Sequence, residues 1–184
     1  GNDELYGADK PGNDLEDETS DDELYGQAGD DLLAGGLGAD LLDGGEGTDT
    51  ATYARSDAGV TINLATGAVG GGDAEGDELV SIENVIGSAH DDTFTGDDNA
   101  NAFDGGAGDD TVVFTGNRAD YTIDMDADGN LTVADGTTGI VSVKNIETLS
   151  FADGETVSIL HVAADGSGAY TTIQAAIDAA NEGD

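Results

Sequence analysis

Aspartate recurs at one phase of a nine-residue period in the first third of the chain. Three units follow one another without a gap, at residues 26–34, 35–43 and 44–52. Each unit has glycine at positions one and four, aspartate at position six and an apolar residue at position eight. Regularly spaced carboxylates beside glycine-rich turns, which leave carbonyl groups accessible, offer the hard oxygen ligands that Ca²⁺ takes in proteins. The pattern therefore indicates cation binding.

The same period predicts the elements that hold these carboxylates. The six glycine-rich residues of a unit can turn tightly, and the other three form a short strand whose middle side chain points inward. Two units make one coil, and coils stack at the spacing of neighbouring strands, about 4.7–4.9 Å. Turns two units apart then lie over one another, so that their position-six carboxylates converge. We expect an all-β chain built on a parallel β-roll.

These units resemble the RTX (repeats-in-toxin), or hemolysin-type, calcium-binding family, and the resemblance implies several Ca²⁺ ions as the cofactor. In that family one turn supplies the carbonyls of positions two and four, the next but one supplies those of positions one and three, and both supply aspartate. Carried onto this chain, the resemblance implies a first site formed by Asp31, Asp49 and the carbonyls of Gln27, Gly29, Gly44 and Glu46.

The same frame returns in a second block. Residues 105–113 match it fully, and residues 87–95 and 96–104 precede them in register. The resemblance implies a site formed by Asp92, Asp110 and the carbonyls of Ser88, His90, Gly105 and Ala107. A weaker site is expected between Glu83 and Asn101, because asparagine keeps an oxygen ligand but lacks the charge. We expect Val85, Phe94, Phe103 and Val112 to point inward.

The frame is damaged before residue 26. Asp22 stays in register with the regular units of residues 26–52. By the family resemblance, this register implies a site formed by Asp22, Asp40 and the carbonyls of Glu18, Ser20, Gly35 and Leu37. Two further candidate pairs are Asp3 with Asp22 and Asp14 with Asp31. The chain starts in mid-repeat, which suggests that it belongs to something longer.

The composition indicates that folding depends on the cation. The chain has 41 acidic and 4 basic residues, a net charge of −37, and its Leu, Ile, Val and Phe make up only about a fifth of it. Such a balance lies at the boundary of disorder. Without cations the stacked carboxylates repel one another, whereas cation binding becomes folding free energy. The alternative, a solvated acidic surface, predicts scattered carboxylates and not carboxylates at one phase.

The same features predict where the protein acts and what it binds. Extracellular modules bind calcium with Kd values of about 10⁻⁴ to 10⁻³ M, and the family is exported by type I secretion, so we expect a secreted protein. There is no cysteine, and no apolar run approaches the length of a membrane span. The negative charge argues against nucleic acid as a partner.

Strand patterns follow each block. Alternating segments bounded by Gly and Asp predict antiparallel hairpins that close the blocks, and Tyr53 and Phe114 begin equivalent stretches 61 residues apart. The chain is therefore interpreted as two copies of one unit, a roll followed by a hairpin. The expected divisions are a first roll block at 1–52, a hairpin at 53–82, a second block at 83–113, capping strands at 114–160, and a linker or the start of another domain at 161–184.

Two segments leave alternatives open. Residues 124–131 have the spacing of an EF-hand loop, but their flanks are strand-like, so they form either a plain hairpin turn or a surface cation site. Residues 161–180 run from a strand into a short helix and resemble the opening of the β-helix domain of pectin methylesterases and pectate lyases. The alternative is a short helix that belongs to the repeat module.

Nothing in the chain predicts a catalytic centre. Neither His90 nor His161 is expected to act as a base or as a zinc ligand. The preferred function is a non-catalytic calcium-binding module that folds on export and stabilises or positions a covalently adjacent domain, which the C-terminal resemblance makes a polysaccharide-acting enzyme. The alternatives are a fragment or substrate-binding module of a carbohydrate-active enzyme, with acidic polysaccharide as a partner, and a structural spacer of an adhesin.

Overall fold

A computed structural model describes residues 1–7, 20–125, 131–136 and 139–159, and nearly every element in these ranges is a strand of three or four residues. The strands are β1 Glu4–Tyr6, β2 Glu23–Tyr25, β3 Leu32–Ala34, β4 Leu41–Asp43, β5 Thr50–Thr52, β6 Thr61–Asn63, β7 Ala68–Gly70, β8 Glu78–Val80, β9 Asn84–Ile86, β10 Thr93–Thr95, β11 Asn101–Asp104, β12 Thr111–Val113, β13 Thr122–Met125, β14 Leu131–Ala134, β15 Val141–Lys144, β16 Thr148–Ser150 and β17 Thr156–Ser158. Two 3₁₀ turns, η1 Gly72–Ala74 and η2 Arg118–Asp120, complete the elements.

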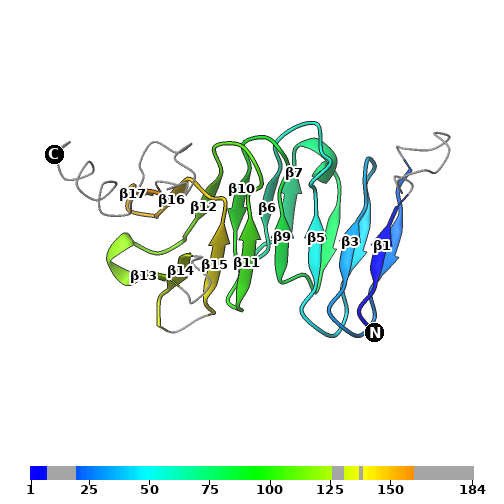
Figure 1. The fold of residues 1–184 in the computed structure, drawn as a ribbon, viewed down its shortest axis with the longest axis horizontal. Helices are drawn as coiled ribbons and strands as arrows, with labels where there is room; N and C mark the ends of the chain where they lie inside the picture. Colours follow the sequence, from blue (N-terminus) through cyan, green and yellow to red (C-terminus); the bar gives the residue numbers. More distant parts are fainter. Residues whose placement is uncertain (8–19, 126–130, 137–138, 160–184) are drawn as a thin grey trace, which may run out of the picture.

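The strands form a parallel β-roll. One row of parallel strands runs β1-β3-β5-β9-β11-β15, and it is visible along the long axis in Figure 1. The intervening strands form a second set, in which β2-β4-β8 and β6-β10-β12-β16 are parallel neighbours. Within the repeats, paired residues are 18 positions apart, as Leu24 with Leu42 and Leu33 with Ala51. Two nonapeptides therefore make one coil, as the period predicts.

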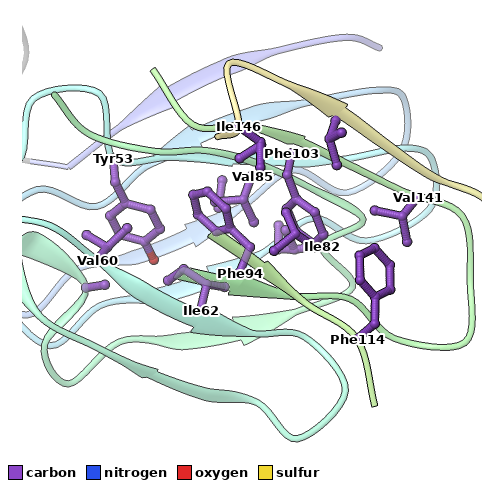
Figure 2. Close-up of a cluster of buried hydrophobic side chains, with 14 of the residues drawn as sticks. Tyr53, Val60, Ile62, Ile82, Val85, Phe94, Phe103, Phe114, Val141 and Ile146 are labelled. Carbon is purple, nitrogen blue, oxygen red and sulfur yellow. The ribbon is translucent and has the colours of Figure 1, made fainter. Parts of the chain in front are cut away.

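The core is a column of position-eight side chains. Leu33, Leu42 and Phe94 are fully buried, because the middle residue of each three-residue strand points inward. The inward residues predicted for the second block, Val85, Phe94, Phe103 and Val112, are all buried. The rings of Phe94 and Phe103 stack with their centroids 5.2 Å apart, and Figure 2 shows them at the centre of the buried cluster.

The two repeat blocks share one sheet. Strand β5 ends the first block and pairs directly with β9, so that Ala51 lies beside Val85. The intervening segment forms the β6–β7 hairpin, whose strand β6 extends the second set beside β10, and then β8, which pairs with β4. The first hairpin thus contributes strands to a continuous roll and does not mark a break after Thr52.

The two halves of the chain repeat one design. In the first half β4 pairs with β8 and β5 with β9, and in the second half β11 pairs with β15 and β12 with β16. After β16 the strand β17 pairs antiparallel, and so do β14 and β13 beside β15. Beyond β16 and β15 the roll is therefore closed by antiparallel strands.

The structure corrects the expected pairing of Asp3 with Asp22. Strand β1 pairs with β3, which places Asp3 beside Asp31. The reason is the length of the first coil: 28 residues separate Asp3 from Asp31, compared with 18 between the aspartates of a regular coil. Asp14, Glu18, the centre of the EF-hand-like segment, His161 and the C-terminal segment lie outside the described residues.

Substituting Phe94→Ala tests the core. The change removes a fully buried ring from a stacked pair, and we expect it to lower the free energy of unfolding by about 3–5 kcal/mol. Tyr25→Ala is the matched control, since Tyr25 is 45% exposed on β2, and it should change the free energy by less than about 1 kcal/mol. Thermal unfolding in saturating calcium measures both, and equal losses would contradict the assigned core.

Candidate metal centre

The position-six aspartates form ladders along the roll. The backbone N–H of Asp31 donates to Oδ1 of Asp49 over 2.8 Å, and Asp22 and Asp92 donate to Asp40 and Asp110 in the same way, each over 2.7 Å. The three pairs implied by the repeat frame are thus brought together. Each carboxylate reaches from its own turn to the backbone of the equivalent turn one coil away.

The second oxygen of several of these carboxylates lacks a donor. Asp31, Asp49 and Asp110 are almost completely buried, and within the described residues their Oδ2 atoms have no hydrogen-bond partner. A buried carboxylate oxygen without a partner is costly, and the cost falls when it is protonated or binds a cation.

Oδ2 atoms of the ladder aspartates lie beside position-one glycines, where the missing side chain leaves room for them. A Cβ atom added to Gly26 would lie 2.6 Å from Oδ2 of Asp31 and 2.6 Å from the carbonyl oxygen of Gly44. The carboxylate of one turn and the position-one carbonyl of the next therefore converge beside Gly26. Gly87 has the same surroundings, with Asp92 and the Gly105 carbonyl. Convergent carboxylate and carbonyl oxygens fit Ca²⁺.

Other expected carbonyl ligands lie at the contact between turns. The carbonyl of Gln27 accepts a hydrogen bond from Glu46 N over 2.8 Å, and the carbonyl of Glu46 accepts one from Gly29 N over 2.9 Å. The carbonyl of Ser88 accepts one from Ala107 N over 3.4 Å. Each carbonyl has a second lone pair, so these bonds leave it able to bind a cation.

A family model decides what these turns are. The model of the RTX calcium-binding nonapeptide repeat matches the chain in four copies, over residues 18–51 and 81–112. These segments are RTX calcium-binding repeats. RTX repeats bind calcium ions, which identifies Ca²⁺ as the cation that the convergent oxygens fit. A search of curated proteins gives no match to the chain.

The RTX repeats of the second block differ from those of the first. Both oxygens of Asp92 have donors: Ser88 N reaches Oδ2 over 2.7 Å, and Val60 N reaches Oδ1 over 2.7 Å. Asn101 and Glu83 do come together, but through the Asn101 amide, which donates to the Glu83 carbonyl over 3.1 Å. This contact is a neutral hydrogen bond. The backbone N–H of His90 donates to Ser88 Oγ within the same turn.

Two further carboxylates extend the ladders, and the nonapeptide frame did not reveal them. Asp40 N donates to Oδ1 of Asp77 over 2.9 Å, and Asp110 N donates to Oε2 of Glu147 over 2.8 Å. A local signal exists for Asp77, because Leu79 follows it at the spacing of positions six and eight. Glu147 could have been found from its Ile-Glu dipeptide, which also occurs at Ile82-Glu83.

Burial shifts the proton affinity of the ladder carboxylates. Desolvation raises the pKa of Asp110 to about 6, and the neighbouring charges of Asp92 and Glu147 add to the rise. Desolvation also raises the pKa of Asp77 to about 6 and raises that of Asp49. In the described ranges no three His, Cys, Asp or Glu side chains gather around one point.

Substituting Asp49→Asn tests the first site. The amide removes one charge from a buried ladder, and we expect the calcium concentration at half-folding to rise on the order of tenfold. Asp57→Asn removes one charge from an exposed position and should leave the midpoint unchanged. Circular dichroism during a calcium titration measures both, and equal midpoints for the two variants would refute the assignment.

The raised pKa values predict a pH dependence of the calcium-free chain. Because the folded-state pKa of Asp110 is about 6 and its ordinary value is 3.8, the folded form binds its proton more tightly. The calcium-free fold should therefore gain stability as pH falls from above 6 towards 3.8. Far-UV circular dichroism after dialysis against calcium-free buffers at pH 7.5 and 5 checks this.

Asp110→Asn serves as the control for that pH series, because the neutral amide stands in for the protonated carboxyl. This variant should show a smaller gain on acidification. A calcium-free chain with less β-structure at pH 5 than at pH 7.5 would contradict the prediction.

Proposed function

We propose that this chain is a module that folds on export, when a secreted protein passes from a low-calcium cytosol into a calcium-rich medium. The observation that supports it best is the set of buried Oδ2 atoms without a hydrogen-bond partner in the described residues, at Asp31, Asp49 and Asp110. A net charge of −37 adds repulsion that opposes closure of the roll without cations. Calcium removes both penalties together.

The free energy available from calcium is sufficient for this role. A site at which free calcium is ten times its Kd contributes RT ln 11, about 1.4 kcal/mol. About five such sites contribute about 7 kcal/mol, which is comparable with the whole stability of a typical domain. A chain with so few large apolar side chains can therefore be unfolded in one compartment and folded in the next. Export of an unfolded chain through a narrow type I conduit suits this behaviour.

The folded module stabilises or positions a covalently adjacent domain, for which we propose a polysaccharide-acting enzyme. The antiparallel strands beyond β15 and β16 support this role, because they end the parallel stacking of coils and leave β13 and β17 as edge strands against which a neighbouring domain can pack. In the described part of the chain, no helix is long and apolar enough to cross a bilayer.

A pocket favours a second candidate, a substrate-binding module. It lies against β3 and β5 and is lined by Tyr6, Thr52 and Arg55, among others. The guanidinium of Arg55 lies 5.8 Å from the centre of the Tyr6 ring. An aromatic ring beside a guanidinium suits a sugar, and Asp73 lines the same pocket. Direct binding of an acidic polysaccharide to the chain would support this candidate. The row of strands along the long axis (Figure 1) would also suit a spacer in an adhesin.

A calcium titration tests the folding role. The chain in EDTA at pH 7.5 should show little β-structure, and millimolar calcium should restore it, with a midpoint of about 10⁻⁴ to 10⁻³ M. Magnesium at the same concentration is the control for ionic strength and should restore little, because it demands a tighter octahedral geometry. Equal β-structure in EDTA and in calcium would refute the proposal.

A further inference from the structure

Two short turns occupy equivalent places in the two halves of the roll. Ser81-Ile82-Glu83 connects β8 to β9, and Asn145-Ile146-Glu147 connects β15 to β16. Each has three residues where a nonapeptide has a six-residue turn. Ser81 and Asn145 adopt positive φ values of 51° and 50°, and Ile82 and Ile146 are buried. Both turns therefore begin with a left-handed residue and are anchored by a buried isoleucine.

Each short turn contacts a full RTX turn through its glutamate. Oε2 of Glu83 accepts the N–H of Asp49, and Oε2 of Glu147 accepts the N–H of Asp110, both over 2.8 Å. A position-six aspartate makes this contact in the regular coils, as Asp49 does to Asp31. The longer glutamate side chain thus takes the place of aspartate in a turn that is three residues shorter.

The short turns also present a carbonyl to an orphaned oxygen. The Ser81 carbonyl and Oδ2 of Asp49 both lie against Gly44, where a Cβ would contact each of them. The Asn145 carbonyl and Oδ2 of Asp110 lie against Gly105 in the same way. Asp49 and Asp110 are fully buried, and their Oδ2 atoms have no hydrogen-bond partner among the described residues.

This arrangement reproduces the regular site between Asp31 and the Gly44 carbonyl. In each case a carboxylate oxygen of one turn and the first carbonyl of the stacked turn converge beside a position-one glycine. The two oxygens of Asp49 face different neighbours, since Oδ1 accepts Asp31 N and Oδ2 lies beside Ser81. Asp49 can therefore contribute to one site with Asp31 and to another with the short turn.

We propose that the two short turns complete two additional calcium sites, one formed by Asp49, Glu83 and the Ser81 carbonyl, the other by Asp110, Glu147 and the Asn145 carbonyl. The proposal rests on the calcium-dependent function proposed above. The first of these sites ties the segment after the β6–β7 hairpin to the first repeat block. The second ties the last coil to the second block, outside the residues that the family model matches.

Glutamine variants test the two sites. Glu83→Gln and Glu147→Gln remove a charge but keep an oxygen that can accept the aspartate N–H. We expect each variant to bind one calcium ion fewer than the wild-type chain, or to bind it on the order of tenfold more weakly, and the double variant to lose two. Glu78→Gln and Glu155→Gln, at exposed positions, are the matched controls and should bind as the wild type does. Isothermal titration calorimetry on the full chain gives the number and affinity of the ions.

An unchanged calcium count together with unchanged affinities in both glutamine variants would overturn the proposal, because glutamates that only accept a hydrogen bond are replaced well by glutamine. Asp31→Asn separates this failure from that of the proposed function. If Asp31→Asn loses or weakens a site and the glutamine variants bind calcium as the wild type does, only the short-turn sites are refuted. If the wild-type chain binds no calcium, both proposals fail.

Terbium anomalous scattering from crystals of the wild-type chain gives a measurement that does not depend on whether the variants fold. Peaks between Asp49 and Ser81 and between Asp110 and Asn145 are expected. Peaks at the regular turns together with none at the short turns would overturn the proposal.

Discussion

The burial of carboxylates between stacked turns is the constraint on which this structure depends. Asp31, Asp49 and Asp110 each accept a backbone N–H of the neighbouring coil through Oδ1, and their other oxygens are enclosed without a donor in the described chain. In most domains such groups are avoided, since desolvation of an unpaired charge opposes folding. Here the same groups leave no room for side chains at the position-one glycines, and burial raises the pKa of Asp49 and Asp110. The small apolar column of Leu33, Leu42 and Phe94 packs the coils together, but it does not offset the cost of burying unpaired carboxylates. A bound cation is needed to offset that cost.

Much of the roll could be predicted because one short period specifies both strand and turn. The phase that makes Leu33 and Leu42 inward also places Asp31 over Asp49 and Asp92 over Asp110, so the fold and the regular sites follow from the same spacing. The pairing of Asp3 with Asp31 could not be obtained in this way, because the first coil is ten residues longer than a regular one. The nine-residue period does not indicate which strand pairs with β1 after such an insertion.

The parts that escaped prediction lie where the turn length changes. Glu147 sits in a three-residue turn, so counting by nine does not reach it, although its carboxylate contacts Asp110 as an aspartate of a full turn would. The direct pairing of β5 with β9 was hidden for the same reason, since their paired residues are 34 positions apart, whereas the period would place them 18 apart. Such non-local pairing depends on the burial of side chains such as Ile82 and Ala74 in the core. This burial is a property of the assembled core and cannot be obtained from the local spacing.

Asp49 faces two neighbouring turns, and this affects how steeply folding depends on the calcium concentration. Because Oδ1 of Asp49 faces one coil interval and Oδ2 faces the next, fixing the carboxylate in one interval orients it for the other. Neighbouring sites that share a ligand in this way behave as a one-dimensional array with nearest-neighbour coupling. Calcium bound between two turns lowers the free energy needed to order the next pair of turns. A row of individually weak sites therefore fills cooperatively, over a narrow range of calcium concentration. The chain would then change from unfolded to folded over that range, and the boundary between ordered and unordered coils would move along the roll one coil at a time.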